Sequence, residues 1–246
     1  KNESLNQMKK YLLALLALVL LPVPVKADLN KSIDQTTQYL MKNWRSDETL
    51  NKLYPPQVLS VPTGTKVYGG CGEFIEGDHV GGSLYCPYTH TVFLDTTQLQ
   101  NFYDAYGNSS IAYIIAHEFS HALQREFKIK LNDPNHELQA DCLAGVFIAQ
   151  GSEKLGITRE DVISMAWVAY NIGGEVHGTG AQRSYSLLSG MGRANSDCKP
   201  SSIQKLVDGD ISDPLYAKLN RTRSGYKNQD LNVTPYPKTA KGALGI

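Results

Sequence analysis

The sequence has no excess of charge of either sign and no basic stripe. Its 246 residues include 24 Lys and Arg against 24 Asp and Glu. Because a nucleic-acid-binding surface needs clustered positive charge, nucleic acid is not expected as a partner. Internal repeats and low-complexity stretches are also lacking, which argues against a repeat architecture.

A basic start and a short apolar run open the chain. The run covers residues 11–25, contains Pro22 and Pro24, and is too short and too interrupted to span a bilayer comfortably. It leads into a Val-Lys-Ala sequence ending at Ala27, which fits a signal-peptide cleavage site. We therefore expect residues 1–27 to be a removable signal peptide that leaves no membrane anchor. An uncleaved anchor is the alternative, which the two prolines disfavour.

This leader sets the expected location and domain organisation. Residues 1–7 precede Met8 and are interpreted as lying upstream of the true start. The protein is expected to be exported to the periplasm or the extracellular medium. The cleavage point has no cysteine, so a lipid anchor is not expected. Residues 28–246 suit a single domain with one core. Within it, the polar residues 220–246 are a candidate for a disordered tail.

The segment 117–121, His-Glu-Phe-Ser-His, fits the pattern H-E-x-x-H. On a helix this spacing places two imidazoles one turn apart on one face, where both can reach one zinc ion. We expect residues 108–110, Asn-Ser-Ser, to cap that helix. The competing interpretation is an ordinary buried helix in which His117 and His121 are core histidines. Apolar residues recur around the motif at helical intervals: Ile111, Ile114, Ile115, Phe119, Ala122 and Leu123.

A catalytic zinc site needs three protein ligands and an open position for water. The pattern with a histidine six residues after the second one would need Gly at 124 and His at 127. Gln124 and Phe127 stand there instead, so that arrangement is excluded. Glu137 is the expected third ligand, because Asp133-Pro134 should start a second helix with Glu137 in its first turns.

Asp141 lies four residues after Glu137 on the same helical face. From there it can accept a hydrogen bond from the outer nitrogen of a ligand imidazole, for which His117 is the candidate. The joint presence of the two carboxylates at this spacing argues against a secreted binding module that carries the histidine motif by accident.

The segment 137–146, Glu-Leu-Gln-Ala-Asp-Cys-Leu-Ala-Gly-Val, follows the H-E-x-x-H helix and resembles the putative neutral zinc metallopeptidase family of bacterial envelope proteins. The family usually has Gly where Ser120 stands and a further His where Ala122 stands. Neither position is an expected ligand, so the predicted metal site is unaffected. The similarity covers roughly residues 40–200 and includes 85–87, 92–95, 177–179, 182–183 and Cys198.

The resemblance implies an α+β, mainly helical fold with a zincin-like metallopeptidase core and a small β-sheet beside the H-E-x-x-H helix. Thr91–Asp95 is the candidate edge strand for an extended substrate. His79 and His90 are interpreted as loop histidines outside the metal site, and the Gly-rich residues 69–82 as a loop. Local patterns predict strands at 58–61, 83–86 and 91–94, and helices at 33–45, 96–106, 137–149, 158–172, 181–191 and 201–207.

Cys71, Cys86, Cys142 and Cys198 make an even number in a chain expected to be exported, where disulfides persist. Four cysteines allow three pairings. We expect Cys71 to pair with Cys86, which closes a short loop, and Cys142 with Cys198, which ties the third-ligand helix to the C-terminal region. The competing hypothesis is that Cys142 binds zinc. It is disfavoured because Asp141 faces the metal and Cys142 is rotated by about 100° on the helix.

If His117, His121 and Glu137 bind one zinc ion, Glu118 is free to act as the general base toward the zinc-bound water. The predicted function is that of an exported zinc-dependent metallopeptidase acting on peptides or proteins. A zinc-binding envelope protein that holds a partner without cutting it is one alternative, although it would not need Glu118. A zinc hydrolase of non-peptide amides is another, because the same groups polarise any carbonyl.

The oxyanion that forms during such a reaction needs a second electrophile besides zinc. His177 is the candidate, with Arg183 and Tyr170 behind it, because the resemblance places residues 177–178 and 182–183 among the family's recurrent features. The competing interpretation of His177 is a helix-flanking residue that bonds to the backbone.

Overall fold

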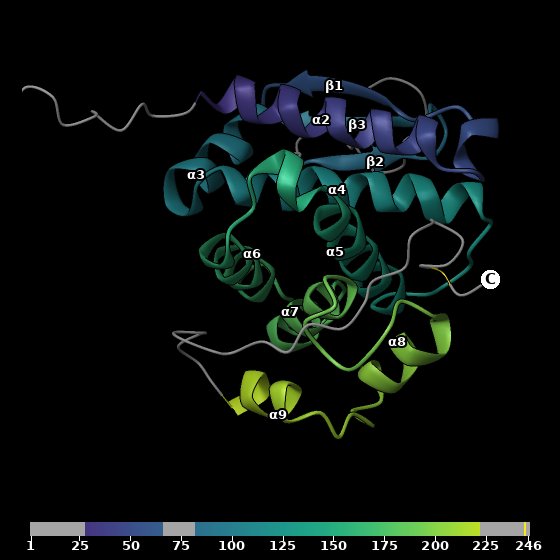
Figure 1. Cartoon of the computed structure of the whole chain (residues 1–246), viewed down its shortest axis with the longest axis vertical. Helices are drawn as coiled ribbons and strands as arrows, with labels where there is room; N and C mark the ends of the chain where they lie inside the picture. The colour runs from purple at the N-terminus through teal and green to yellow at the C-terminus, as the bar shows by residue number, and fades with distance from the viewer. Residues whose placement is uncertain (1–27, 66–81, 222–243, 245–246) are drawn as a thin grey trace, which may run out of the picture.

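The computed structural model describes residues 28–65, 82–221 and 244. It confirms the α+β, mainly helical fold (Figure 1). The predictions for residues 1–27, for Cys71 and His79, and for most of the C-terminal tail fall outside the described residues. The elements are α2 (Leu29–Ser46), η1 (Leu50–Lys52), β1 (Gln57–Val61), β2 (Leu84–Cys86), β3 (Thr91–Asp95), α3 (Thr96–Tyr106), α4 (Asn108–Glu126), α5 (Asn135–Leu155), α6 (Arg159–Asn171), α7 (Gly180–Gly190), α8 (Pro200–Val207) and α9 (Pro214–Arg221). All the predicted strands and helices are present, whereas α9 was not predicted.

Helix α4 lies at the centre of the molecule. In Figure 1, α2 and the sheet lie on one side of it, and α5, α6 and α7 lie on the other. Because it is covered from both sides, every residue of 109–120 is buried. A helix that is enclosed in this way must be apolar around most of its circumference. The functional side chains of the H-E-x-x-H motif are therefore held by a rigid, fully packed element.

The start of α4 differs from the prediction. Gly107 is its N-cap, with a φ of 78°, and no side chain caps the helix. Glycine adopts this positive φ without the steric cost that a Cβ would impose. Asn108 and Ser110, predicted as caps, lie inside the first turn. The Ser110 hydroxyl donates to the Gly107 carbonyl (2.6 Å), and the Asn108 side chain accepts from Ser32 of α2 (2.8 Å).

The sheet has the order β1-β3-β2. Strand β1 pairs parallel to β3, and β2 pairs antiparallel to it, with Tyr85 opposite Val92. The prediction that Thr91–Asp95 forms an edge is therefore wrong, because β3 is the central strand and all five of its residues are buried. A continuous apolar run is what a strand covered on both faces requires. Within the described residues, β1 and β2 form the edges.

A disulfide joins Cys142 of α5 to Cys198, which precedes α8, with a Cα–Cα distance of 5.5 Å. This bond contradicts the competing hypothesis that Cys142 binds zinc, since its sulfur is not available as a thiolate ligand. The predicted partner of Cys86, Cys71, lies outside the described residues. The disulfide thus holds the helix that carries Glu137 and Asp141 to the C-terminal part of the fold.

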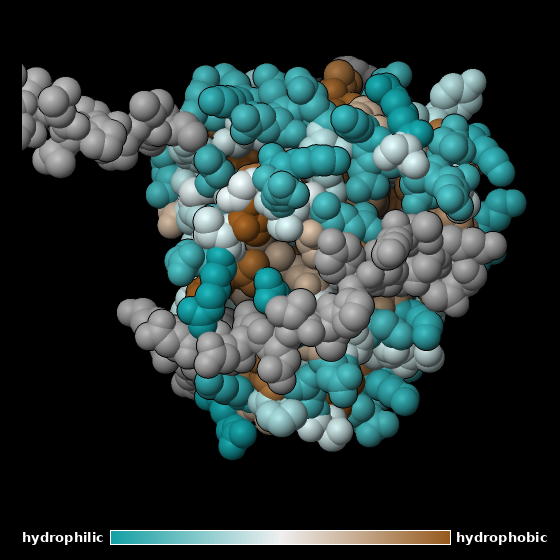
Figure 2. Space-filling view, viewed as in Figure 1, coloured by the Kyte–Doolittle hydropathy of each residue, from teal (hydrophilic) through white to brown (hydrophobic). Residues whose placement is uncertain are grey.

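Figure 2 shows a mostly hydrophilic face, with hydrophobic side chains visible in a hollow near its centre. Among the helices of the described segments, none combines the length and the apolar character that crossing a membrane would require.

Helices α5 and α7 cross at two glycines. A Cβ on Gly190 would overlap the backbone of α5 at the Cys142 carbonyl, and a Cβ on Gly145 would overlap the Leu187 carbonyl of α7. The absence of side chains here allows the two backbones to touch. This close approach brings α7 side chains against the face of α5 that carries Asp141.

We expect Gly190→Ala to lower the free energy of unfolding by about 1–3 kcal/mol, the usual cost of overpacking a core. The added methyl group would force α5 and α7 apart, because the atom that it meets belongs to the backbone. Urea unfolding of the two proteins measures the difference. Gly174→Ala is the matched control, since a Cβ there meets nothing within 4 Å. Equal midpoints for wild type and Gly190→Ala would contradict the prediction.

Candidate metal centre

Helices α4 and α5 bring three predicted metal ligands together. The Nε2 atoms of His117 and His121 are 3.1 Å apart. Glu137 Oε2 lies 3.2 Å from His117 Nε2, and Glu137 Oε1 lies 3.4 Å from His121 Nε2. His117 and His121 come from successive turns of α4, as the spacing of the motif predicts, and Glu137 lies in the first turn of α5.

These separations fit the dimensions of a zinc site. Zinc binds histidine nitrogen and carboxylate oxygen at about 2.0–2.2 Å with tetrahedral geometry, which places neighbouring ligand atoms about 3.3 Å apart. The three observed distances run from 3.1 to 3.4 Å. One ion can therefore be accommodated by His117, His121 and Glu137 with almost no movement of the side chains.

The hydrogen bonds of the outer ring nitrogens orient both imidazoles. His117 Nδ1 lies 2.8 Å from Asp141 Oδ1, the hydrogen bond predicted from the sequence, and His121 Nδ1 lies 2.8 Å from Gln124 Oε1. Since both partners are acceptors, each Nδ1 carries the proton. Both Nε2 atoms then face the Glu137 carboxylate. These three groups converge on one point, which suits a cation or a proton shared between them.

Gln124 is held so that its oxygen must face His121. Its amide nitrogen donates to the His136 carbonyl (2.8 Å) and to Gln139 Oε1 (3.1 Å). No role was predicted for Gln124, which stands where another zinc-binding pattern would have glycine. The structure shows that this buried side chain fixes the tautomer of His121.

Asp141 is the centre of a buried polar network. Arg183 donates from Nε to Oδ2 (2.8 Å) and from a terminal nitrogen to Oδ1 (2.9 Å), and the Tyr113 hydroxyl donates to Oδ1 (2.6 Å). Burial raises the pKa of Asp141, but Arg183 and His117 outweigh this effect and hold it below its ordinary value. Arg183 was predicted to lie behind the oxyanion site. The structure shows it buried in an ion pair with Asp141, and it orients His117 through that carboxylate.

Glu118 is buried next to the cluster, with 7% of its surface exposed. Burial raises the pKa of its carboxyl group to about 8, and a hydrogen bond from the Tyr85 backbone opposes the shift. Tyr85 lies on β2, so the edge strand of the sheet reaches the carboxylate predicted to be the general base. A carboxyl group with such a pKa can both accept and release a proton near neutral pH.

His177 lies at the rim of the cluster. Its Nε2 is 3.9 Å from Glu137 Oε2, and its side chain is 52% exposed. It is held in a short turn closed by a β-bridge between Gly174 and Gly178.

Tyr170, in the last turn of α6, packs edge-on against Trp167 with ring centroids 5.9 Å apart. His90 lies outside the cluster, as expected, and bonds to the Tyr85 hydroxyl and the Tyr54 carbonyl.

His136 lies beside the cluster and was not predicted. Its ring stacks on His121 with centroids 4.7 Å apart and planes inclined by 31°. The signal available in the sequence was its position directly before Glu137 at the start of a helix. Predictions that follow one face of a helix do not detect neighbours that reach the site from an adjacent face.

The charges in the cluster predict a pH-dependent zinc affinity. Burial lowers the pKa of His117, but Asp141 and Glu137 outweigh it and raise the pKa to about 10. Burial raises the pKa of the Glu118 carboxyl group to about 8. At pH 7 the metal-free protein therefore holds protons on both groups, and zinc displaces them. Because the metal-free state binds more protons, zinc affinity is expected to increase between about pH 6 and 8.

Isothermal titration of zinc in buffers of different ionisation enthalpy measures the number of protons released. The wild type is expected to release about two protons per zinc ion at pH 7, and Glu118→Gln about one. Equal affinity at pH 6 and 8, with no protons released, would contradict the assigned charges.

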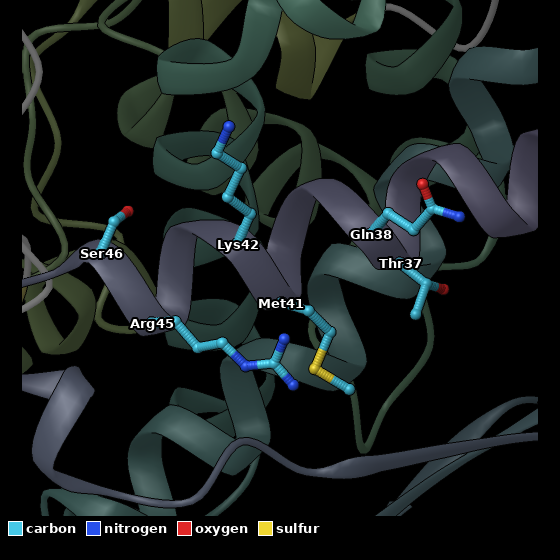
Figure 3. Close-up of a pocket in the computed structure, with 6 residues that line it drawn as sticks. All are labelled: Thr37, Gln38, Met41, Lys42, Arg45 and Ser46. Atoms are coloured by element: carbon cyan, nitrogen blue, oxygen red, sulfur yellow. The ribbon is translucent and has the colours of Figure 1, made fainter.

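A separate cavity of about 450 Å³ lies along α2 (Figure 3). Among the described residues, none that lines it belongs to the cluster of histidines and carboxylates, so this cavity is not the candidate active site. The described lining residues come from α2 and are Thr37, Gln38, Met41, Lys42, Arg45 and Ser46.

Comparison with known proteins is consistent with this geometry. A family model described as "Putative neutral zinc metallopeptidase" matches residues 26–187, more than half of the chain. Two curated relatives, from Escherichia coli (strain K12) and Escherichia coli O6:H1, are both described as "Uncharacterized protein YpfJ". Each is 34% identical over a match that covers 32% of this chain and 33% of the relative, so the chain spans about a third of their length. No solved structure matches the chain.

Proposed function

The chain belongs to the putative neutral zinc metallopeptidase family, and from this membership we propose that it is an exported zinc-dependent metallopeptidase that hydrolyses peptide bonds. The observation that carries the proposal is the convergence of His117, His121 and Glu137 at 3.1–3.4 Å beside the buried carboxyl group of Glu118. A zinc ion bound by these three residues supplies a Lewis acid that polarises the peptide carbonyl and makes water more acidic.

Glu118 is proposed as the general base and acid. It takes a proton from the attacking water and passes it to the leaving amine. Its pKa, raised to about 8 by burial, suits a group that must hold a proton for part of the reaction. The hydrogen bond from the Tyr85 backbone orients the carboxylate without neutralising it. Replacement of Glu118 is the most direct test of this role.

Edge strand β2 is the proposed platform for an extended substrate, in place of the central strand β3. Within the described residues β2 pairs only with β3, so its other side is open to a peptide except at the Tyr85 amide, which donates to Glu118. The contact between Tyr85 and Glu118 supports this choice, because a peptide on β2 would pass beside the proposed general base.

His177 is proposed to stabilise the oxyanion. Its exposure and its distance of 3.9 Å from Glu137 support a position at the mouth of the site, where an incoming substrate would meet it. Substitution of His177 should lower kcat and leave zinc bound, because this side chain is not among the three ligands.

Export is supported by the leader pattern of residues 1–27 and by the disulfide between Cys142 and Cys198.

The decisive experiment is zinc-dependent degradation of a fluorescently labelled unfolded protein by the purified chain. Activity should disappear when the metal is chelated and return when zinc is restored. Hydrolysis of small amides without cleavage of the unfolded protein would indicate that the protein is an amide hydrolase and not a peptidase. Stoichiometric zinc binding without any hydrolysis would instead support a non-catalytic partner-binding protein.

A further inference from the structure

A second group of possible metal ligands lies beside the first and shares one residue with it. One ligand atom each from Asp133, His136 and Glu137 lie within 4.8 Å of one another. Asp133 is exposed, His136 is half-buried, and the Glu137 side chain is 14% exposed. The second group therefore lies on the solvent side of the first, with the Glu137 carboxylate between them.

The start of α5 explains why these three side chains meet. The His136 amide donates to the Asn132 carbonyl (3.2 Å) and the Leu138 amide to the Pro134 carbonyl (2.9 Å), so backbone hydrogen bonds fold the chain back on itself just before the helix begins at Asn135. The Asp133–Pro134 peptide bond within this turn is cis. In this turn the Asp133 carboxylate lies on the side on which His136 and Glu137 project.

His136 is fixed in place but chemically unused. The Gln124 amide, which holds His121, also binds the His136 carbonyl, and the His136 ring stacks on His121. In the part of the chain that the structure describes, the His136 ring nitrogens and the Asp133 carboxylate form no hydrogen bond. The positioned imidazole therefore has ring nitrogens available for a ligand.

We propose that Asp133, His136 and Glu137 form a second zinc site, which is weaker than the first and shares the Glu137 carboxylate with it. Imidazole nitrogen combined with carboxylate oxygen suits zinc rather than calcium or magnesium, which prefer oxygen ligands. Two ions that share a carboxylate usually lie about 3.5–4 Å apart. Closure around an ion needs only a small movement of the exposed Asp133 side chain.

The second ion binds less tightly for two reasons. It is repelled by the ion already held by His117, His121 and Glu137, and only the charge of Asp133 is added to offset that repulsion. In addition, Asp133 is exposed and must lose side-chain freedom on binding. The second site is therefore filled only when free zinc exceeds the concentration that saturates the first.

Equilibrium dialysis against buffered zinc, followed by metal analysis, tests this proposal on the purified protein. The wild type is expected to bind about one zinc ion at low free zinc and about two at higher free zinc. Asp133→Ala and His136→Ala should retain about one ion over the whole range, whereas His136→Cys, which keeps a zinc ligand, should restore the second. Asp210→Ala, which removes an exposed carboxylate elsewhere, is the matched control and should bind as the wild type does.

The outcomes distinguish failure of this proposal from failure of the proposed function. The second site rests on that function because both assign Glu137 as a zinc ligand. A wild type that never exceeds one zinc ion overturns the second site alone. A second ion that persists in both Asp133→Ala and His136→Ala places it elsewhere and also overturns the site. A protein that binds no zinc overturns both proposals. Because Asp133 is exposed, its substitution tests the site even if loss of His136 disturbs the stacked His121 ring.

Discussion

Replacement of Glu118 by glutamine is expected to lower kcat for peptide hydrolysis by about 10²–10⁴-fold and to leave zinc binding in place. The amide has nearly the same shape as the carboxyl group and can still accept the hydrogen bond from the Tyr85 backbone, but it cannot take a proton from water. The three proposed ligands are unchanged, so metal content should stay at the wild-type level. The measurement is the rate of cleavage of an unfolded protein at saturating substrate, together with the zinc content of the same sample.

Glu126→Gln provides the matched control for this substitution. Glu126 is the last residue of α4, pairs with Arg125 at a distance of 2.6 Å, lies 4.0 Å from His90, and is not among the described residues that could hold a metal ion. Its loss should leave kcat near the wild-type value. If Glu118→Gln cleaves as fast as the wild type with zinc bound, Glu118 is not the general base. If it loses zinc instead, the residue contributes to metal binding and its role must be assigned again.

The convergence of the proposed ligands follows from short-range spacing, which is why the sequence predicts it well. Two residues four apart on a helix always point the same way, and this holds for His117 with His121 and for Glu137 with Asp141. The helices themselves are predicted by their apolar periodicity. One inference beyond the local pattern was needed, namely that α4 and α5 face one another, and the requirement of a zinc site for a third protein ligand supplied it.

The arrangement of the sheet could not be obtained in the same way. Strand β1 pairs with β3 parallel and from more than thirty positions away, as Gln57 opposite Thr91 shows. No local pattern specifies such a partner. A signal was nevertheless present, because Val92, Phe93 and Leu94 form a continuous apolar run, which is typical of a strand enclosed on both faces. That run should have indicated β2 rather than β3 as the edge.

The role of Arg183 also depends on distant contacts. The close crossing of α5 and α7 at Gly145 and Gly190 brings the guanidinium onto Asp141, and nothing in the spacing of the sequence indicates that two helices will approach so closely. Buried arginines require a partner, but the sequence does not show which residues are buried. The pairing of Arg183 with Asp141 therefore emerges only from the folded chain.

This pairing predicts that Asp141→Leu lowers the free energy of unfolding by about 3–5 kcal/mol, because Arg183 would remain buried without a counter-charge. Both side chains are almost fully buried, with 4% of Arg183 and none of Asp141 exposed. Replacing the pair together, as Asp141→Leu with Arg183→Met, should recover most of that stability, since well-packed apolar side chains can replace a buried ion pair. Urea unfolding of the chelated proteins measures both differences.

Zinc affinity should not recover with stability. In both variants His117 Nδ1 loses the carboxylate that now accepts its proton at 2.8 Å, so the tautomer and orientation of the ring are no longer fixed. Loss of such a partner usually weakens metal binding by about 10–100-fold. Competition with a zinc chelator of known affinity measures the loss. A double variant that regains stability but binds zinc weakly separates the two roles of Asp141. Wild-type affinity in that variant would mean that Asp141 serves only to neutralise Arg183.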